Sequence, residues 1–295
     1  MNVRIGINPL TWSNDDMPEL GADTPLEVCL SESRQAGYVG VELGHKFPRD
    51  AATLRPMLQR NRLALISGWY GARLLEHTAE DEITALQSHL TLLTDMGCEV
   101  MVFAEVTGCV HGDRMAPLST RPRLDADQWS ILCTRMTAVA DYLLVRGVQL
   151  AYHHHMGTVI ETEAEIDRLM AETGDTVGLL LDTGHLAYAG GEPLTVIANH
   201  ADRIVHVHCK DVREDVLTDA RARNWSFLDA VLHGVFTVPG DGSIEFPAVL
   251  AALAQARYRG WLVVEAEQDP GVAHPLTYAT MGYEYLSRLI EPSQS

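Results

Sequence analysis

Four apolar runs in this chain each end in histidine, aspartate or glutamate, and this pattern constrains the fold more than any other feature. The runs lie in residues 148–157, 177–185, 203–211 and 260–267. The first ends in His153-His154-His155, and the last ends in Glu265-Ala-Glu267. A buried strand that terminates in such side chains delivers metal ligands or bases to the edge of a sheet. We therefore interpret the other segments of the chain as the scaffold that positions these four strand ends.

Short apolar strands alternate with helical segments along the rest of the chain. Thr24 and Pro25 predict the start of the first helix, as its N-cap and its first helical residue. We predict strands at 3–8, 38–43, 63–67, 99–105, 148–153, 177–182, 203–208 and 260–265. We predict helices at 25–36, 50–61, 78–96, 127–146, 163–172, 193–200, 247–256 and 275–290. Alternation of this kind predicts parallel strands joined by helical crossovers.

Eight such units predict an α/β fold of the (β/α)8 type, a TIM barrel with its catalytic groups at the carboxyl ends of the strands. An open doubly wound sheet would need a glycine-rich turn after the first strand, and residues 8–13, Asn-Pro-Leu-Thr-Trp-Ser, do not form one. We expect one domain over residues 1–295. Residues 106–123 have no clear period and predict a long loop of the kind that covers active sites. Residues 212–238 form an insertion after the seventh strand.

The charge and cysteine content narrow the classes of protein. The net charge of −18 argues against a nucleic-acid partner and against an anionic membrane surface. The five cysteines include no CxxC pair, which favours reduced thiols and a cytoplasmic location. The first residues lack the pattern of a signal peptide, and no apolar run approaches the ~20 residues of a membrane helix. The sequence does not fix the oligomeric state and is compatible with a homo-oligomer.

The strand-end residues favour a metal site when they are taken together. A lone histidine at a strand end is usually structural, Asp182 could cap a helix, and Lys210 could pair with Asp211 in a turn. Four neighbouring strand ends, however, would gather these charges in one cavity, where burial without a cation is costly. Mixed imidazole and carboxylate ligands suit Mn²⁺, Co²⁺, Fe²⁺ or Zn²⁺ better than Ca²⁺ or Mg²⁺. A ligand set with open positions is typical of catalysis.

Motifs along nearly the whole chain resemble the xylose-isomerase-like superfamily of metal-dependent sugar isomerases and epimerases. Within it the sequence is similar to the inosose dehydratases of inositol catabolism. The triple histidine and the Glu-Ala-Glu-Gln-Asp-Pro run at 265–270 are more specific to the dehydratases than the superfamily motifs around Asp182 and Glu265. The other matching segments are residues 14–21, 37–44, 206–213 and 234–242.

The resemblance implies a set of metal ligands. The superfamily places Glu, Asp, His and Glu at the ends of strands five to eight, and Asp182, His208 and Glu265 match the last three. At the fifth strand the expected glutamate is replaced within the histidine run. His153 aligns best with this ligand position, whereas a shift of one residue would select His154. The resemblance implies a divalent cation, for which we favour Mn²⁺ or Co²⁺, and glutathione as a further cofactor.

The resemblance also implies a reaction on a small polyol ketone, the dehydration of 2-keto-myo-inositol (scyllo-inosose) to a trihydroxycyclohexane-1,2-dione. One group must remove the proton beside the ketone, and another must protonate the departing hydroxyl. Glu265 or Glu267 is the candidate for proton removal. The candidates on the leaving-group side are His155, His185, His111 and Lys210. Because side chains alternate along a strand, Glu267 shares the face of Glu265, one step nearer the rim.

Three other functions fit parts of the sequence. A ketose epimerase or keto-inositol isomerase on the same barrel would use similar ligands. A repair endonuclease of the related barrel type should carry a basic groove, and the net charge of −18 weighs against it. A metal-stabilised polyol-binding protein would bind the ligand without turnover.

Overall fold

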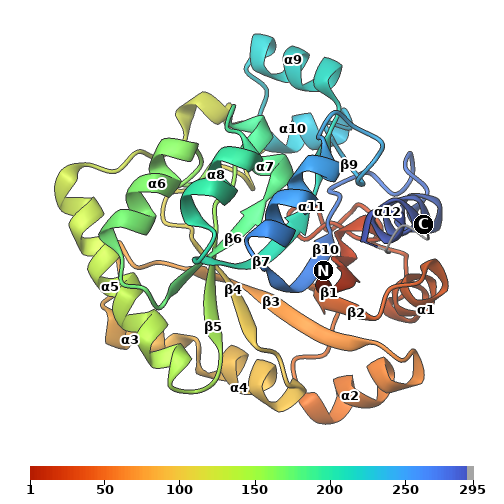
Figure 1. The fold of residues 1–295 in the computed structure, drawn as a ribbon, viewed down its shortest axis with the longest axis horizontal. Helices are drawn as coiled ribbons and strands as arrows, with labels where there is room; N and C mark the ends of the chain where they lie inside the picture. The colour runs from red at the N-terminus through yellow and green to blue at the C-terminus, as the bar shows by residue number, and fades with distance from the viewer. Residues whose placement is uncertain (291–295) are drawn as a thin grey trace.

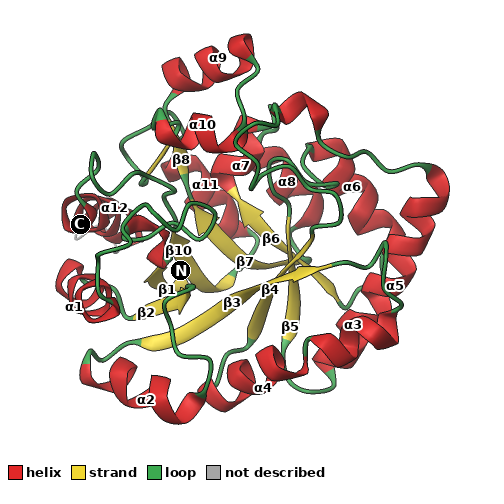
Figure 2. Ribbon diagram, turned by 180° about the vertical axis from the view of Figure 1, so that it is seen from behind, coloured by secondary structure: helices red, strands yellow, loops and turns green. Residues whose placement is uncertain are grey.

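Eight parallel strands close into a barrel, which confirms the predicted (β/α)8 fold. The computed structural model describes residues 1–290. Around the barrel the strands follow the order β1-β2-β3-β4-β5-β6-β7-β10, and β10 pairs with β1. Figures 1 and 2 show the strands at the centre and the helices outside them. The barrel strands are β1 (Asn2–Ile7), β2 (Gly40–Leu43), β3 (Ala64–Ala72), β4 (Val100–Glu105), β5 (Gln149–His153), β6 (Val177–Asp182), β7 (Ile204–Cys209) and β10 (Arg259–Val264).

Alternation along the strands separates an inner face from an outer face. Ala151 and Leu180 belong to a small apolar cluster, and Val263 to another, and these clusters contain only alternate residues of their strands. The residues between them, such as Tyr152 and Leu181, belong to the main core against the helices. Inward-facing residues are two positions apart along a strand. The residue two positions after each of these apolar residues therefore also faces the inside of the barrel, at the carboxyl end of its strand.

The helices of the outer layer agree with the prediction except at three points, one of which is the short helix at Thr183–Tyr188, which was not predicted. Pro25 is extended and is the N-cap of α1, so the helix begins one residue later than expected and Thr24 does not cap it. The single helix predicted at 78–96 is wrong, because a turn at Leu86, where ψ is −6°, separates two helices. The helices are α1 (Leu26–Ala36), α2 (Ala51–Arg60), α3 (Ala79–Ala85), α4 (Gln87–Met96), α5 (Ala126–Leu144), α6 (Glu163–Glu172), α7 (Thr183–Tyr188), α8 (Pro193–His200), α11 (Phe246–Gln255) and α12 (Pro275–Ile290).

Three segments outside the regular barrel pack together, and we call them the cap: residues 14–23, 106–123 and 212–238. Met17, Leu118 and Phe227, one from each segment, share a second apolar cluster. The last segment contains α9 (Glu214–Arg223) and α10 (Phe227–Leu232), and its ends pair as the strands β8 (Asp211–Val212) and β9 (Phe236–Thr237). Figure 1 shows α9 as the helix that projects furthest from the barrel.

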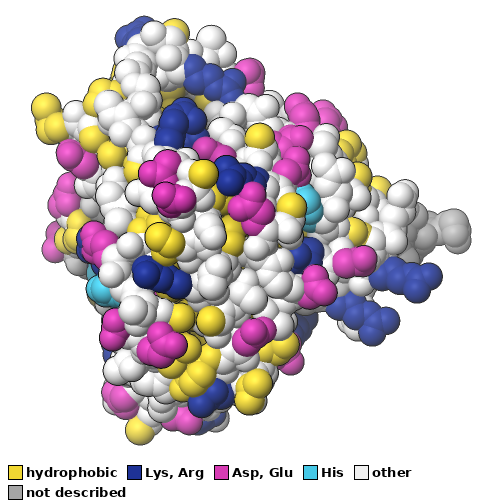
Figure 3. Space-filling model, turned by 90° about the vertical axis from the view of Figure 1, so that its left-hand side faces the viewer, with side chains coloured by type: hydrophobic (Ala, Val, Ile, Leu, Met, Phe, Trp, Pro, Cys, Tyr) yellow, Lys and Arg dark blue, Asp and Glu magenta, His cyan; other side chains and the backbone are white. Residues whose placement is uncertain are grey.

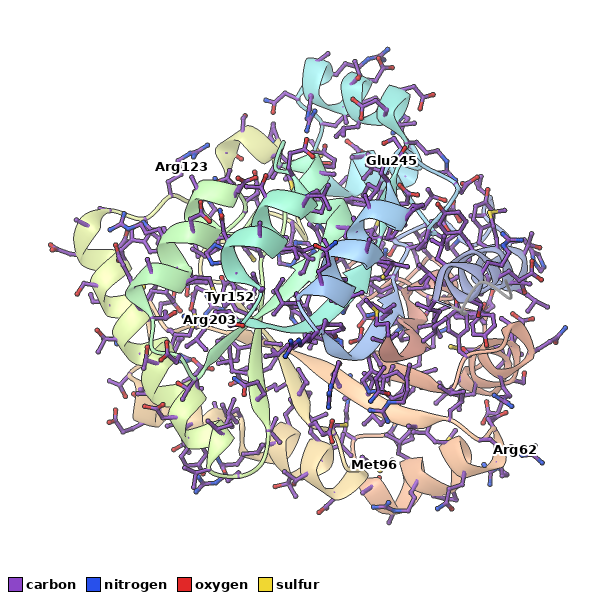
Figure 4. All side chains as sticks on the ribbon, viewed as in Figure 1. Arg62, Met96, Arg123, Tyr152, Arg203 and Glu245 are labelled. Carbon is purple, nitrogen blue, oxygen red and sulfur yellow. The ribbon has the colours of Figure 1, made fainter. Side chains whose placement is uncertain are left out.

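The opposite end of the barrel is held by Arg203, at the start of β7 and labelled in Figure 4. Its guanidinium donates hydrogen bonds to the carbonyl oxygens of Val177 at 2.9 Å and Met170 at 3.0 Å, which ties β7 to β6 and α6. On the face drawn in Figure 3, acidic and basic side chains are interspersed. No helix within residues 1–290 is both long enough and apolar enough to cross a membrane.

Candidate metal centre and catalytic pocket

Four buried side chains at adjacent strand ends converge inside the barrel, and we call them the cage: His153, Asp182, His208 and Glu265. One ligand atom from each lies within 4.8 Å of the others. Asp182 Oδ2 is 3.4 Å from His153 Nε2 and 3.5 Å from His208 Nδ1, and Glu265 Oε2 is 3.0 Å from the same His208 nitrogen. The cage continues the inner face of β5, β6, β7 and β10, so alternation along the strands positions it.

The cage also depends on the start of α7. Asp182 is the N-cap of this helix, and its Oδ1 accepts a hydrogen bond from the His185 amide at 2.8 Å. This contact leaves Oδ2 free to face the two imidazoles. Gly184 is required beside it, because a Cβ at this position would collide with the aliphatic stem of Lys210. The Asp-Thr-Gly-His motif therefore caps the helix and also makes room for the lysine.

Glu42, at the end of β2, supports the cage from inside the barrel. It lies against Nε2 of His208 at 3.1 Å and accepts hydrogen bonds from the Ser67 hydroxyl at 2.6 Å and the Asn8 amide at 2.8 Å. Asn8 donates a second hydrogen bond to Glu265 at 2.8 Å. Burial lowers the pKa of His208, but Glu265 and Glu42 raise it well above its ordinary value, so a cation that binds His208 Nδ1 would displace a proton.

Lys210 forms the centre of a second buried cluster. It is one of only two lysines in the chain, and its side chain is fully buried. Its Nζ lies 2.7 Å from Glu265 Oε1, 2.9 Å from Glu267 Oε2 and 2.9 Å from His185 Nε2. Glu267 in turn lies 3.9 Å from His155 Nε2. The ammonium therefore links the cage to the cluster of Glu267, His185 and His155.

Burial and charge act in opposite directions on these groups. Burial raises the pKa of Glu265, but His208 and Lys210 lower it more, to about 2. Burial lowers the pKa of Lys210, but Glu265, Glu267 and Asp182 hold it above its ordinary value. At His153 the effect of burial exceeds the opposing effect of Asp182, and the pKa falls to about 3. The structure therefore favours ionised carboxylates, an ammonium and a neutral imidazole at His153.

A cavity of about 140 Å³ opens onto both clusters. Its walls include His153, His208, Glu265, Glu267 and His155. The volume is well above the ~10–15 Å³ that one water requires, so the cavity accommodates a small organic molecule. His185 and Lys210 lie behind this wall and contact it through Glu267.

The structure brings most of the residues proposed from the sequence to this cavity. His111 reaches it from the long loop, and its ring centroid lies 4.9 Å from that of His155. His154 points away from the cage, because it occupies the alternate position after β5, and its Nε2 accepts a hydrogen bond from the Asp182 amide at 3.3 Å. His153 is therefore the member of the triple histidine that faces Asp182 and His208.

Several residues of the site were not recognised from the sequence. Glu42 follows the apolar residues of β2 in the same way that Asp182 follows those of β6, so the pattern could have identified it. Trp69 on β3 and Asp16 on the segment after β1 also line the cavity. Asp16 lies in no comparable run, and only the folded structure brings it to the site.

The chemistry of the cage fits a divalent cation. His208 Nδ1, which faces Asp182 and Glu265 in the cage, is buried and has no hydrogen-bond partner among the described residues. Asp182 and Glu265 contribute two carboxylates beside the imidazoles of the cage. A cation with imidazole and carboxylate ligands would give the His208 nitrogen a partner and compensate the two carboxylates.

Comparison with known proteins places the chain in a family. Residues 30–289 match the model of the xylose isomerase-like TIM barrel, and the chain belongs to this family. It is 55% identical to the rhizopine catabolism protein MocC of Rhizobium meliloti over 289 residues, 98% of this chain and 89% of that protein. It is 44% identical to the inosose dehydratase of Geobacillus thermodenitrificans over 286 residues, 96% of each chain. A crystal structure of the IolI protein with a bound zinc atom has a TM-score of 0.65, with 14% identity over 98% of each chain.

Proposed function

We propose that the chain is a metal-dependent dehydratase of inositol catabolism that converts scyllo-inosose to a trihydroxycyclohexane-1,2-dione and water. The observation that carries the proposal is one cavity that joins the cage to the cluster of Lys210, Glu267 and His155. Elimination of water needs both clusters. The cage must stabilise negative charge at the ketone, and the second cluster must remove one proton from carbon and donate another to the departing hydroxyl. Relatives 41% to 44% identical over nearly the whole chain carry the name inosose dehydratase.

The cage residues His153, Asp182, His208 and Glu265 would hold the divalent cation. When bound, the cation supplies positive charge that stabilises the negative charge developing on the substrate oxygens. Glu42 and Asn8 orient His208 and Glu265 for this purpose. We favour Mn²⁺ or Co²⁺, and the zinc atom in the related IolI barrel supports a divalent cation at such a site.

Glu267 and His155 perform the proton transfers in this proposal. Both line the cavity, and Glu267 Oε1 lies 3.9 Å from His155 Nε2. Glu267 accepts the proton from the carbon beside the ketone, and His155 donates a proton to the departing hydroxyl, which leaves as water. Transfer of the proton from Glu267 back to His155 then restores both groups without exchange with solvent. Lys210 holds the Glu267 carboxylate in place through its contact at 2.9 Å.

Incubation of metal-reconstituted protein with scyllo-inosose tests the proposal. We expect a product lighter by one water, detected by mass spectrometry, with new ultraviolet absorbance from the enolised dione. A ketose epimerase or keto-inositol isomerase would conserve the mass, and a polyol-binding protein would bind scyllo-inosose without turnover. Either result would reject the dehydratase. Addition of glutathione to the same assay tests whether it acts as a further cofactor.

A further inference from the structure

The segment at residues 14–23 carries an acidic side chain to the cavity, and the proposed mechanism does not use it. Asn14 shapes this segment, because its Oδ1 accepts hydrogen bonds from the backbone amides of Asp16 and Met17, both at 2.8 Å. The Met17 side chain is buried in the cap. Asp16 is therefore presented by a local turn that is anchored on its far side by apolar packing.

A glycine closes the same segment against the barrel. Gly21 has a φ of 73°, and a Cβ at this position would collide with the carbonyl oxygen of Trp12. The backbone amide of Asn14 also donates a hydrogen bond to the Leu20 carbonyl at 3.2 Å. Because both ends of the turn are fixed, the position of Asp16 at the cavity follows from the fold of the segment.

The Asp16 carboxylate faces the cavity without a close partner. Its side chain is 31% exposed, and its Oδ1 lies 3.8 Å from His111 Nε2, which is too long for a hydrogen bond. His111 comes from the long loop, and its Nδ1 is buried with no hydrogen-bond partner among the described residues. Two polar side chains from different parts of the cap thus meet at the cavity with unused hydrogen-bonding capacity.

We propose that Asp16 binds ring hydroxyls of the polyol substrate at the cap side of the cavity, with His111 beside it as a second hydrogen-bonding group. Within the described residues, the cavity wall contains carboxylates and imidazoles but no lysine or arginine. Such a wall fits an uncharged polyol and would repel a phosphorylated or carboxylated sugar. Trp69, 38% exposed, offers apolar surface to the ring carbons in the same cavity. The inference rests on the proposed function, because it assigns the recognition of that substrate.

The protonation of Asp16 sets the conditions for a test. Burial raises the pKa of Asp16 to about 6, with Glu267 and Asp15 acting in the same direction and His155 opposing them. At pH 8 the carboxylate is therefore ionised and accepts hydrogen bonds from hydroxyls. A hydrogen bond to a charged group contributes roughly 10- to 100-fold to affinity.

The experiment compares Asp16→Asn with the native protein at pH 8, with Mn²⁺ loaded and metal content measured. We expect the KM for scyllo-inosose to rise roughly 10-fold or more, with kcat within about threefold and an unchanged melting temperature. Unchanged metal content and melting temperature would separate substrate binding from a structural role. Asp23→Asn is the matched control, because Asp23 lies in the same segment, is exposed and does not line the cavity. We expect its KM to stay within about twofold of the native value.

A second measurement keeps the test independent of turnover. The Kd for scyllo-inosose is measured by calorimetry in the slow Glu267→Gln background, with and without Asp16→Asn. A native protein that binds scyllo-inosose but does not turn it over would reject the proposed function, while an Asp16-dependent Kd would still support this inference. A KM and a Kd that both stay within twofold in Asp16→Asn would overturn it, and so would a native protein that does not bind scyllo-inosose.

Discussion

Replacement of Lys210 by methionine tests the electrostatic design of the site. Methionine keeps most of the aliphatic stem that packs against Gly184, but it removes the charge between Glu265 and Glu267. Loss of one partner from a buried ion pair costs about 3–5 kcal/mol, because the remaining charge is left without compensation. At about 2–4 °C per kcal/mol, the melting temperature should fall by roughly 6–20 °C.

The metal provides an internal check on this reasoning. In metal-free protein, Lys210→Met leaves Asp182, Glu265 and Glu267 without the ammonium, and the full loss of stability should appear in urea unfolding. In Mn²⁺-saturated protein the cation lies beside Asp182 and Glu265, so the loss should be smaller. Turnover of scyllo-inosose should fall by ~10–100-fold even at full metal occupancy, because Glu267 loses its orientation.

A surface pair provides the matched control for Lys210→Met. Arg73 and Glu76 form an ion pair with side chains 51% and 49% exposed, so Arg73→Met should cost less than about 1 kcal/mol. A free energy of unfolding for Lys210→Met that stays within about 1 kcal/mol of native, with and without Mn²⁺, would refute the reasoning. It would mean that the neighbouring carboxylates are neutral or already compensated by other groups.

Three further predictions concern the metal. Dialysis against a chelator should abolish turnover, and Mn²⁺ or Co²⁺ should restore it; activity that persists below ~0.1 metal equivalents would exclude a metal-dependent reaction at a tight catalytic site. Glu265→Gln should lose metal and nearly all turnover together, whereas Glu267→Gln should retain its metal and still lose turnover; the reverse pattern of metal contents would show that Glu267 is the ligand. Glu42→Gln should weaken metal binding by ~10–100-fold in a competition titration, through its contact with His208, and an unchanged affinity would remove Glu42 from the support of the cage.

The fold could be predicted from the sequence because its signals are local and repeated. Eight apolar runs separated by helical segments leave few alternatives to a barrel. The break at Leu86 has no signal in the sequence, because the residues on both sides have good helical spacing. A small departure in one backbone angle has no clear signature in sequence.

The site was predictable to the extent that it lies on strands. Alternation places His153 inside the barrel and His154 outside it, and the sequence alone could not set this register, because three consecutive histidines look alike. Asp16 lies on a turn whose position depends on Met17 packing against the other cap segments. Contacts between segments that are distant in sequence decide such positions, and the local pattern does not contain them.

The histidine at the end of β5 alters the charge balance of the cage. Where the family pattern expects a glutamate, His153 is neutral, so the cage contains only the carboxylates of Asp182 and Glu265. A divalent cation is neutralised by two carboxylates, whereas a third would leave the filled cage negative. Negative charge that develops on the substrate would be repelled by a negative cage and is tolerated by a neutral one. Glu267, a further carboxylate in the cavity wall, lies outside the cage and is held by Lys210. In the proposed mechanism the base therefore lies beside the substrate without reducing the positive charge available from the cation.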